Sequence, residues 1–204
     1  MYSEGKGKVI IVSAPSGAGK TTIVRHLLAG GLNLVFSVSA CSRPPRNHEI
    51  NGKDYYFLST AEFQQKIQEG DFVEWEEVYP GKYYGTLKRE VRRIWDEDHH
   101  ILFDVDVQGG INLKKAFGAR ALALFIMPPS LAELENRLRL RATDTGKSIR
   151  ERVKKASLEL TFAPKFDYTL INDDLEVAKK EAVKVVRCFL DEGSRVITTI
   201  RQQE

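Results

Sequence analysis

Two residues that can bind a triphosphate, Lys20 and Thr21, follow a glycine-rich turn near the start of the chain. Their surroundings match the pattern G-x-x-x-x-G-K-[ST] at every position except the first, where Ala14 stands. Gly17 and Gly19 let successive backbone N–H groups point inward and bind an anion. Lys20 can then reach the β- and γ-phosphates, and the Thr21 hydroxyl can hold Mg²⁺. An ordinary glycine-rich turn with an incidental lysine is the alternative, but a strand before it and a helix after it favour a nucleoside triphosphate. The candidate residues are Ala14, Pro15, Ser16, Gly17, Ala18, Gly19, Lys20, Thr21 and Thr22.

A second candidate phosphate site is the segment Arg43-Pro44-Pro45-Arg46. Polyproline geometry, at ~3.1 Å per residue and three residues per turn, would place the two arginines on one side, about 9 Å apart. Two guanidinium groups can converge on one phosphate dianion, because each binds phosphate oxygens through a planar fork. A basic loop that pairs with surface carboxylates is the alternative interpretation.

Carboxylates and tyrosines follow in the next forty residues. Glu74 alternates with apolar residues on one face of a candidate strand, so it is expected to point toward apolar cover. A carboxylate can accept from both N1–H and N2–H₂ of guanine, whereas adenine presents an acceptor at N1. Glu76 or Glu77 would fit this argument equally well, and a solvated strand residue is the simpler interpretation. Tyr55 and Tyr84 add hydroxyl donors for a phosphate.

Further charges lie later in the chain. Asp104 and Asp106 end a candidate buried strand and share a face at period two, where ligands bind in open α/β sheets. An acid there resembles the carboxylate that holds Mg²⁺ beside a phosphate loop. Arg137 and Arg141, one helical turn apart, and Arg152 on the next helix can neutralise charge on a transferring phosphoryl group. Solvated helix surfaces are the competing explanation for these arginines.

Short apolar runs that alternate with helical periods must position these residues. Candidate strands lie at 8–13, 34–39, 72–79, 101–107, 121–127 and 168–172, and candidate helices at 21–29, 60–69, 111–117, 130–141, 149–160 and 175–190. This alternation predicts an α/β fold with a parallel sheet covered by helices on both faces. The segment 41–85 is rich in turn residues and tyrosine, and we expect a mixed, mostly antiparallel inserted subdomain there. The polar segment 139–149 is a candidate lid.

The composition excludes several classes of protein. With 204 residues, 42% hydrophobic and 29% charged, the chain can bury one core, and a net charge of +3 is too weak a field to indicate nucleic acid. The longest apolar run, 121–127, is far below the roughly 20 residues of a membrane span. Cys41 and Cys188 form no disulfide framework or metal motif, and no signal sequence is recognisable. We expect a cytoplasmic protein of one domain, with no nucleic-acid or membrane partner.

Taken together, these stretches resemble guanylate kinases, and the likeness runs from about residue 9 to residue 178. The matching stretches are 13–22, 36–46, 51–55, 72–75, 83–86, 103–109 and 171–174. Several independent motifs in one order are far more specific than the phosphate loop alone. The resemblance implies a P-loop NTPase-type core at 8–40, 86–138 and 150–192, a GMP-binding insertion at 41–85 and a small helical lid at 139–149.

The resemblance also implies roles for individual residues. Those implied for the GMP phosphate are Arg43, Arg46, Tyr55 and Tyr84, and those for guanine are Ser39, Glu74, Thr86 and Asp106. Those implied for catalysis are Lys20, Arg43, Arg137, Arg141 and Arg152, with Thr21 and Asp104 for Mg²⁺, partly through water, and Asn172 near the ATP nucleoside. Departures from the family pattern are Ala14, Ala142, where a glycine often follows the lid arginine, and Thr86, where some members have serine.

The implied reaction is reversible transfer of the γ-phosphoryl group of ATP to GMP, giving ADP and GDP in purine nucleotide metabolism. The acceptor phosphate is already anionic, so in-line attack needs positioning and charge neutralisation rather than a strong base. Closure over the site would exclude water. Two alternatives remain: a P-loop kinase of another small phosphorylated acceptor, and a non-catalytic interaction module with this fold. Modules of the second kind have typically lost parts of the phosphate loop and lid, which are present here. A homo-oligomer is possible.

Overall fold

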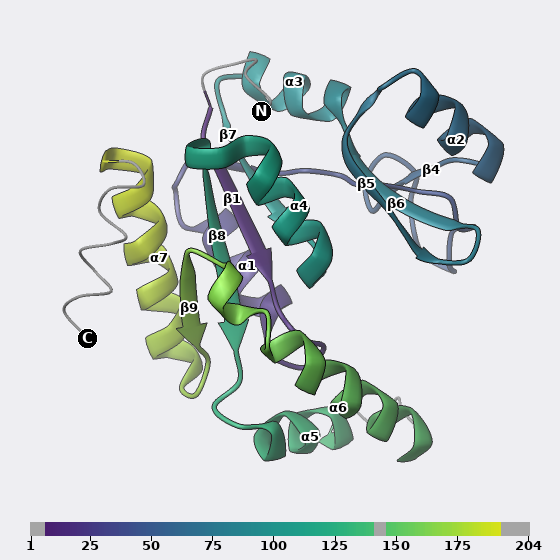
Figure 1. Ribbon diagram of the computed structural model, residues 1–204. Helices are drawn as coiled ribbons and strands as arrows, with labels where there is room; N and C mark the ends of the chain where they lie inside the picture. The colour runs from purple at the N-terminus through teal and green to yellow at the C-terminus, as the bar shows by residue number, and fades with distance from the viewer. Residues whose placement is uncertain (1–6, 141–145, 193–204) are drawn as a thin grey trace.

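A parallel five-stranded sheet forms the centre of the computed structural model, which describes residues 7–140 and 146–192 (Figure 1). Its order is β2-β7-β1-β8-β9, and every neighbouring pair is parallel. The strands are β1 (Val9–Ser13), β2 (Leu34–Phe36), β7 (His100–Asp104), β8 (Ala121–Met127) and β9 (Tyr168–Ile171). The central strands β1, β7 and β8 are buried on both faces, which is why they lack an alternating polar pattern.

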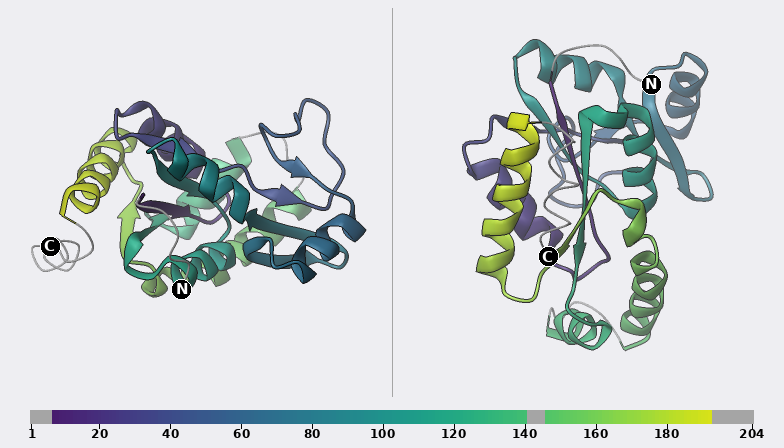
Figure 2. Two further views of the ribbon diagram at one scale, coloured as in Figure 1. Left: turned by 90° about the horizontal axis from the view of Figure 1, so that it is seen from above. Right: turned by 60° about the vertical axis from the view of Figure 1, so that its left-hand side comes forward.

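Helices cover both faces of this sheet, as the alternation of elements predicts. Ile10 and Val12 of β1 pack against α1 (Lys20–Ala29) and α7 (Leu175–Glu192). Val9 and Ile11 face the other way, toward α3 (Lys88–Asp96) and α4 (Val107–Phe117). Figure 2 shows α1 and α7 on one side of the sheet and α4 on the other. Successive residues of the central strand therefore contribute to two separate cores.

A second, smaller sheet lies beside the first, with the order β4-β3-β6-β5. The strands are β3 (Ala40–Cys41), β4 (Tyr56–Phe57), β5 (Phe72–Tyr79) and β6 (Lys82–Leu87). Only β3 and β4 pair in parallel. Helix α2 (Thr60–Gln68) begins with a capping box between Ser59 and Glu62, and its Phe63 ring stacks on Phe72 with centroids 4.3 Å apart. This sheet thus has an apolar cluster of its own.

The remaining helices, α5 (Leu131–Leu140) and α6 (Gly146–Leu160), lie at the end of the large sheet to which β8 points. Leu134 and Leu138 of α5 pack against Ile149 and Ala156 of α6. Arg141 and much of the segment 139–149 lie outside the described residues, so the division into core, insertion and lid stays a prediction. No helix among residues 7–140 and 146–192 is long and apolar enough to span a membrane.

Two expected strands end three residues earlier than the sequence pattern suggests. The strand expected at 34–39 ends at Phe36, and the strand expected at 101–107 ends at Asp104. Asp106 instead caps α4, because its side chain accepts a hydrogen bond from the Gly109 N–H at 2.8 Å. The prediction that Asp104 and Asp106 share one strand face is therefore wrong.

Candidate active site

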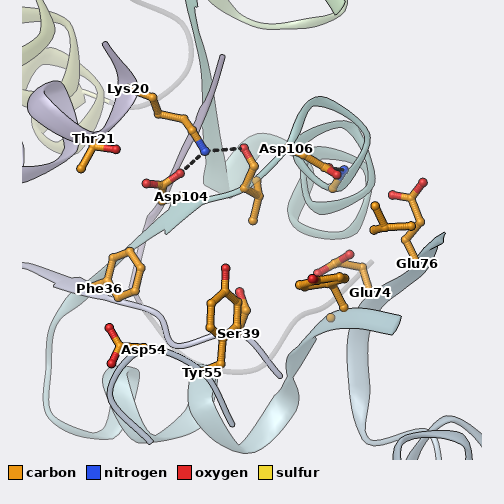
Figure 3. A pocket seen from close by; sticks show the side chains of 15 residues that line it. Lys20, Thr21, Phe36, Ser39, Asp54, Tyr55, Glu74, Glu76, Asp104 and Asp106 are labelled. Atoms are coloured by element: carbon orange, nitrogen blue, oxygen red, sulfur yellow. Dashed lines mark hydrogen bonds and ion pairs between the residues drawn. The ribbon is translucent and has the colours of Figure 1, made fainter. Parts of the chain in front are cut away.

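A cavity of about 400 Å³ lies between the phosphate loop and the second sheet (Figure 3). Its lining includes many of the residues expected from the sequence: Lys20, Thr21, Ser39, Tyr55, Glu74, Tyr84, Asp104 and Asp106. They come from both sheets and from the start of two helices, so the fold brings together groups that are far apart in the sequence. Phe36 and Asp54 also line the cavity and were not predicted to do so, and Glu76, which the sequence left as an alternative to Glu74, lines it as well.

The phosphate loop has the backbone conformation that its glycines allow. Gly17 has φ 99° and Gly19 has φ 96°, in the left-handed region that side chains disfavour. The side-chain amide of Asn172, which is 4% exposed, donates to the Ala18 carbonyl at 2.8 Å. A Cβ on residue 19 would overlap that amide nitrogen. Asn172 therefore supports the loop directly, a contact that the expected place near a nucleoside did not anticipate.

Lys20, which begins α1, forms an ion pair with Asp104 at the end of β7. Its Nζ also donates to the Val105 carbonyl at 3.1 Å. Asp104 and Thr21 both line the cavity and present oxygen atoms, the ligands that Mg²⁺ prefers. Their oxygen atoms fit a Mg²⁺ held jointly with a bound triphosphate. Among the described residues, no group of three or more His, Cys, Asp or Glu side chains could hold a metal ion.

Glu74 pairs with Thr86 across the antiparallel strands β5 and β6. The Thr86 hydroxyl, which is fully buried, donates to Glu74 Oε1 at 2.8 Å. Burial raises the pKa of Glu74 to about 7, and the negative charge of Asp106 adds to the rise that the Thr86 hydrogen bond opposes. A partly buried carboxylate thus faces the cavity with its other oxygen available, as base recognition would require.

Glu76 lies two residues further along the same face of β5. Burial and the charge of Asp106 raise its pKa, while Lys155 of α6 lowers it. Its Oε2 atom is buried and has no hydrogen-bond partner. The charge balance of the cavity is therefore more acidic than the predicted residues alone indicate.

Arg43 has a carboxylate partner, as the alternative interpretation of the basic loop expected, although Glu49 itself was not predicted. Its guanidinium group forms two hydrogen bonds to Glu49, at 2.6 and 2.7 Å, and lies 4.9 Å from the centre of the Tyr55 ring. This pair lowers the pKa of Glu49 to about 2. Tyr84 lies next to Tyr55, with ring centroids 6.1 Å apart. Arg43 is thus oriented beside the two tyrosines, whereas Arg46 is exposed and only its backbone N–H reaches Glu49.

Two of the three expected arginines lie close to the phosphate loop. Arg137 of α5 donates to Glu133 at 2.9 Å and to the Asn172 carbonyl at 3.0 Å. Arg152 of α6 lies 3.4 Å from the Ser16 hydroxyl. The third, Arg141, is outside the described residues. Positive charge from two helices therefore borders the loop that would hold a triphosphate.

Comparison with known proteins agrees with this arrangement. The guanylate kinase family model matches residues 6–189. The guanylate kinase of Bacteroides fragilis is 54% identical over 93% of both chains, and that of Porphyromonas gingivalis is 51% identical over 90% of this chain and 98% of its own. The crystal structure of guanylate kinase from Anaplasma phagocytophilum has a TM-score of 0.72, with 28% identity over 98% of each chain. The phosphate loop, the cavity beside it and these relatives together show that the chain belongs to the guanylate kinase family.

Proposed function

We propose that the protein transfers the γ-phosphoryl group of ATP to GMP, reversibly, giving ADP and GDP. The observation that carries the proposal is one cavity lined both by Lys20 and Thr21 of the phosphate loop and by Glu74, whose carboxylate accepts a hydrogen bond from the buried Thr86 hydroxyl. One end has the chemistry to bind a triphosphate, and the other has acceptors for a guanine base. The guanylate kinase relatives support the same assignment.

ATP would bind along residues 14–22, with its phosphates on the loop N–H groups and the N-terminus of α1. Lys20 would exchange its Asp104 partner for phosphate oxygens, which frees the Asp104 carboxylate. Thr21 and Asp104 would then hold Mg²⁺, partly through water; when bound, the ion neutralises charge on the phosphates and orients them. Arg137 and Arg152 stand near enough to the loop to add positive charge during transfer.

GMP would occupy the opposite part of the cavity. Glu74 would accept from the guanine N1–H and N2–H₂ groups, with Ser39, Thr86 and Asp106 around the base. Arg43, Arg46, Tyr55 and Tyr84 would bind the phosphate, whose oxygen attacks the γ-phosphorus in line. Because Glu49 already orients Arg43, the guanidinium group loses little conformational entropy when the phosphate binds. No residue has to remove a proton, since the attacking oxygen is already anionic.

The test is a coupled assay of ADP release from ATP and Mg²⁺ with GMP, AMP, CMP or UMP as acceptor. Activity with GMP far above the other three supports the proposal. A preference for another nucleotide would contradict the assignment of Glu74 while keeping a P-loop kinase. No release above the ATP-only rate with any of the four would contradict the proposal as a whole. As expected from the sequence, we also propose a cytoplasmic enzyme with no nucleic-acid or membrane partner.

A further inference from the structure

Glu90 is a buried carboxylate outside the cavity. It lies in the first turn of α3, directly after β6, and is 1% exposed. Among residues 7–140 and 148–192, whose burial the structure describes, it is the one charged residue that is buried. A buried charge is costly unless it is fully hydrogen-bonded, so its partners indicate what it is for.

Each of the two carboxylate oxygens of Glu90 accepts two hydrogen bonds. Oε1 accepts from the Val38 backbone N–H at 3.1 Å and from Arg93 at 2.9 Å. Oε2 accepts from the Tyr56 hydroxyl at 2.9 Å and from Nε of Arg93 at 3.1 Å. Burial by itself would raise the pKa of Glu90, but the hydrogen bonds from Arg93, Val38 and Tyr56 lower it overall. The side chain is therefore held as a carboxylate.

Two of the three partners of Glu90, Val38 and Tyr56, are direct chain neighbours of cavity residues. Val38 precedes Ser39, and Tyr56 follows Tyr55; both Ser39 and Tyr55 line the cavity. The Tyr56 backbone N–H also donates to the Ser39 carbonyl at 2.9 Å. The contacts close a ring that runs from Glu90 to Val38, along the chain to Ser39, across to Tyr56 and back to Glu90.

We infer that Glu90 is a positioning residue for the GMP half of the site. By binding Val38 and Tyr56, it fixes the positions of their chain neighbours Ser39 and Tyr55 in the cavity wall. The inference rests on the proposed function, because those two residues are assigned there to GMP. A glutamine cannot replace the carboxylate fully: it has one oxygen acceptor and an NH₂ group that would face the donors of Arg93 or Val38. Lys20 pairs with Asp104 and Val105, whereas the hydrogen bonds of Glu90 reach Val38, Tyr56 and Arg93, so we expect the effect to be specific to GMP.

The variants are Glu90→Gln and Tyr56→Phe, with Glu97→Gln as the matched control. Glu97 caps the C-terminal end of α3 and also pairs with Arg93, at 3.3 Å. Unlike Glu90, it is half exposed. Tyr56→Phe removes one bond of the ring and keeps the aromatic face that lies 4.9 Å from Arg89. It therefore keeps the test valid if Glu90→Gln does not fold.

Steady-state kinetics with each nucleotide varied in turn give the readout, beside a melting curve. We expect KM for GMP to rise about tenfold in Glu90→Gln and about threefold in Tyr56→Phe, because displaced binding groups lose directional contacts. KM for ATP should stay within twofold in both, and Glu97→Gln should match wild type. A lower Tm with KM for GMP unchanged would make Glu90 a purely structural residue, and an equal rise in both KM values would indicate general damage; either result overturns the inference. Wild-type protein inactive on GMP would instead overturn the proposed function together with it.

Discussion

Replacing Glu74 by glutamine changes one oxygen into an NH₂ group and keeps the size of the side chain. A carboxylate offers only acceptors to guanine N1–H and N2–H₂, whereas glutamine must turn a donor toward one of them. We expect a loss of about 2–3 kcal/mol in kcat/KM for GMP, or about 30- to 150-fold, because a buried donor is left facing a donor. KM for ATP should change little, since ATP is assigned to residues 14–22.

Glu74→Gln should also remove the part of the pH dependence of kcat/KM for GMP that arises from ionisation of Glu74. The pKa of Glu74 is raised from 4.5 to about 7, so its ionised fraction falls from about nine-tenths at pH 8 to about one-tenth at pH 6. Wild-type kcat/KM for GMP should therefore drop about tenfold more than that of the variant over this range. The phosphate of GMP also titrates near pH 6, but it does so with both proteins, and the comparison removes its contribution.

Glu74→Gln should lower kcat/KM for GMP but raise the free energy of unfolding above neutral pH. A carboxyl whose folded-state pKa lies above the unfolded one contributes stability below about pH 4.5, and this is lost as the pH rises through about 7. The difference corresponds to at most about 3 kcal/mol, since one unit of pKa equals about 1.36 kcal/mol and water in the cavity reduces the cost. Glu74→Gln should raise the free energy of unfolding at pH 8 by up to that amount and leave it nearly unchanged at pH 4.

Kinetics at pH 6 and pH 8 with each nucleotide varied, together with urea unfolding, test these three effects. Glu77→Gln is the matched control, because Glu77 is an exposed residue of the same strand. If GMP kcat/KM of Glu74→Gln stayed within threefold of wild type, with the same pH profile, the assignment would fail. Asp106 would then be the next candidate for reading the base.

Three further predictions concern the phosphates and the loop. Lys20→Ala should lower kcat at least about a hundredfold while calorimetry still detects GMP binding, and a near-normal kcat would remove the phosphate loop from the mechanism. Arg43→Ala and Arg46→Ala should each weaken GMP binding by about 1.5–3 kcal/mol and guanosine binding much less; an equal loss for guanosine would make the segment structural. Gly19→Ala should cost about 2 kcal/mol or more in urea unfolding and weaken ATP, because its φ is 96° and its Cβ would meet a buried amide. Gly31→Ala, at φ 66° in open space, is the control and should cost less; equal costs would show that the buried amide is irrelevant.

The parts of the fold that depend on local sequence were predictable. The phosphate loop combines a fixed spacing with an apolar strand and an amphipathic helix, and all three occur where the pattern places them. The bounds of β5 and β8 coincide with the expected strands at 72–79 and 121–127. Apolar side chains need burial whatever their neighbours, so their pattern carries the fold on its own.

Polar residues were harder because their role depends on which partner the fold supplies. Asp106 follows a strand and precedes a helix, and the unpaired N–H groups of that helix decide its role as a cap. Arg43 could have met a ligand or a carboxylate, and its partner Glu49 lies on the same loop. Glu90 stands among Lys88, Arg89, Arg92 and Arg93, a run of basic residues typical of a solvated helix face. Only tertiary packing against Val38 and Tyr56 reveals its burial.

Folding of the large sheet depends on the order in which its strands can meet. Leu34 of β2 aligns with His100 of β7, so the chain must close a loop that contains the whole second sheet before this edge pairs. Loop closure costs entropy before the contacts repay it, and proteins dominated by such distant pairings fold slowly. If the cluster around Phe63 forms first, it shortens the effective loop. We expect β2 to join the sheet late, so that loosening this small cluster slows the pairing of β2 with β7.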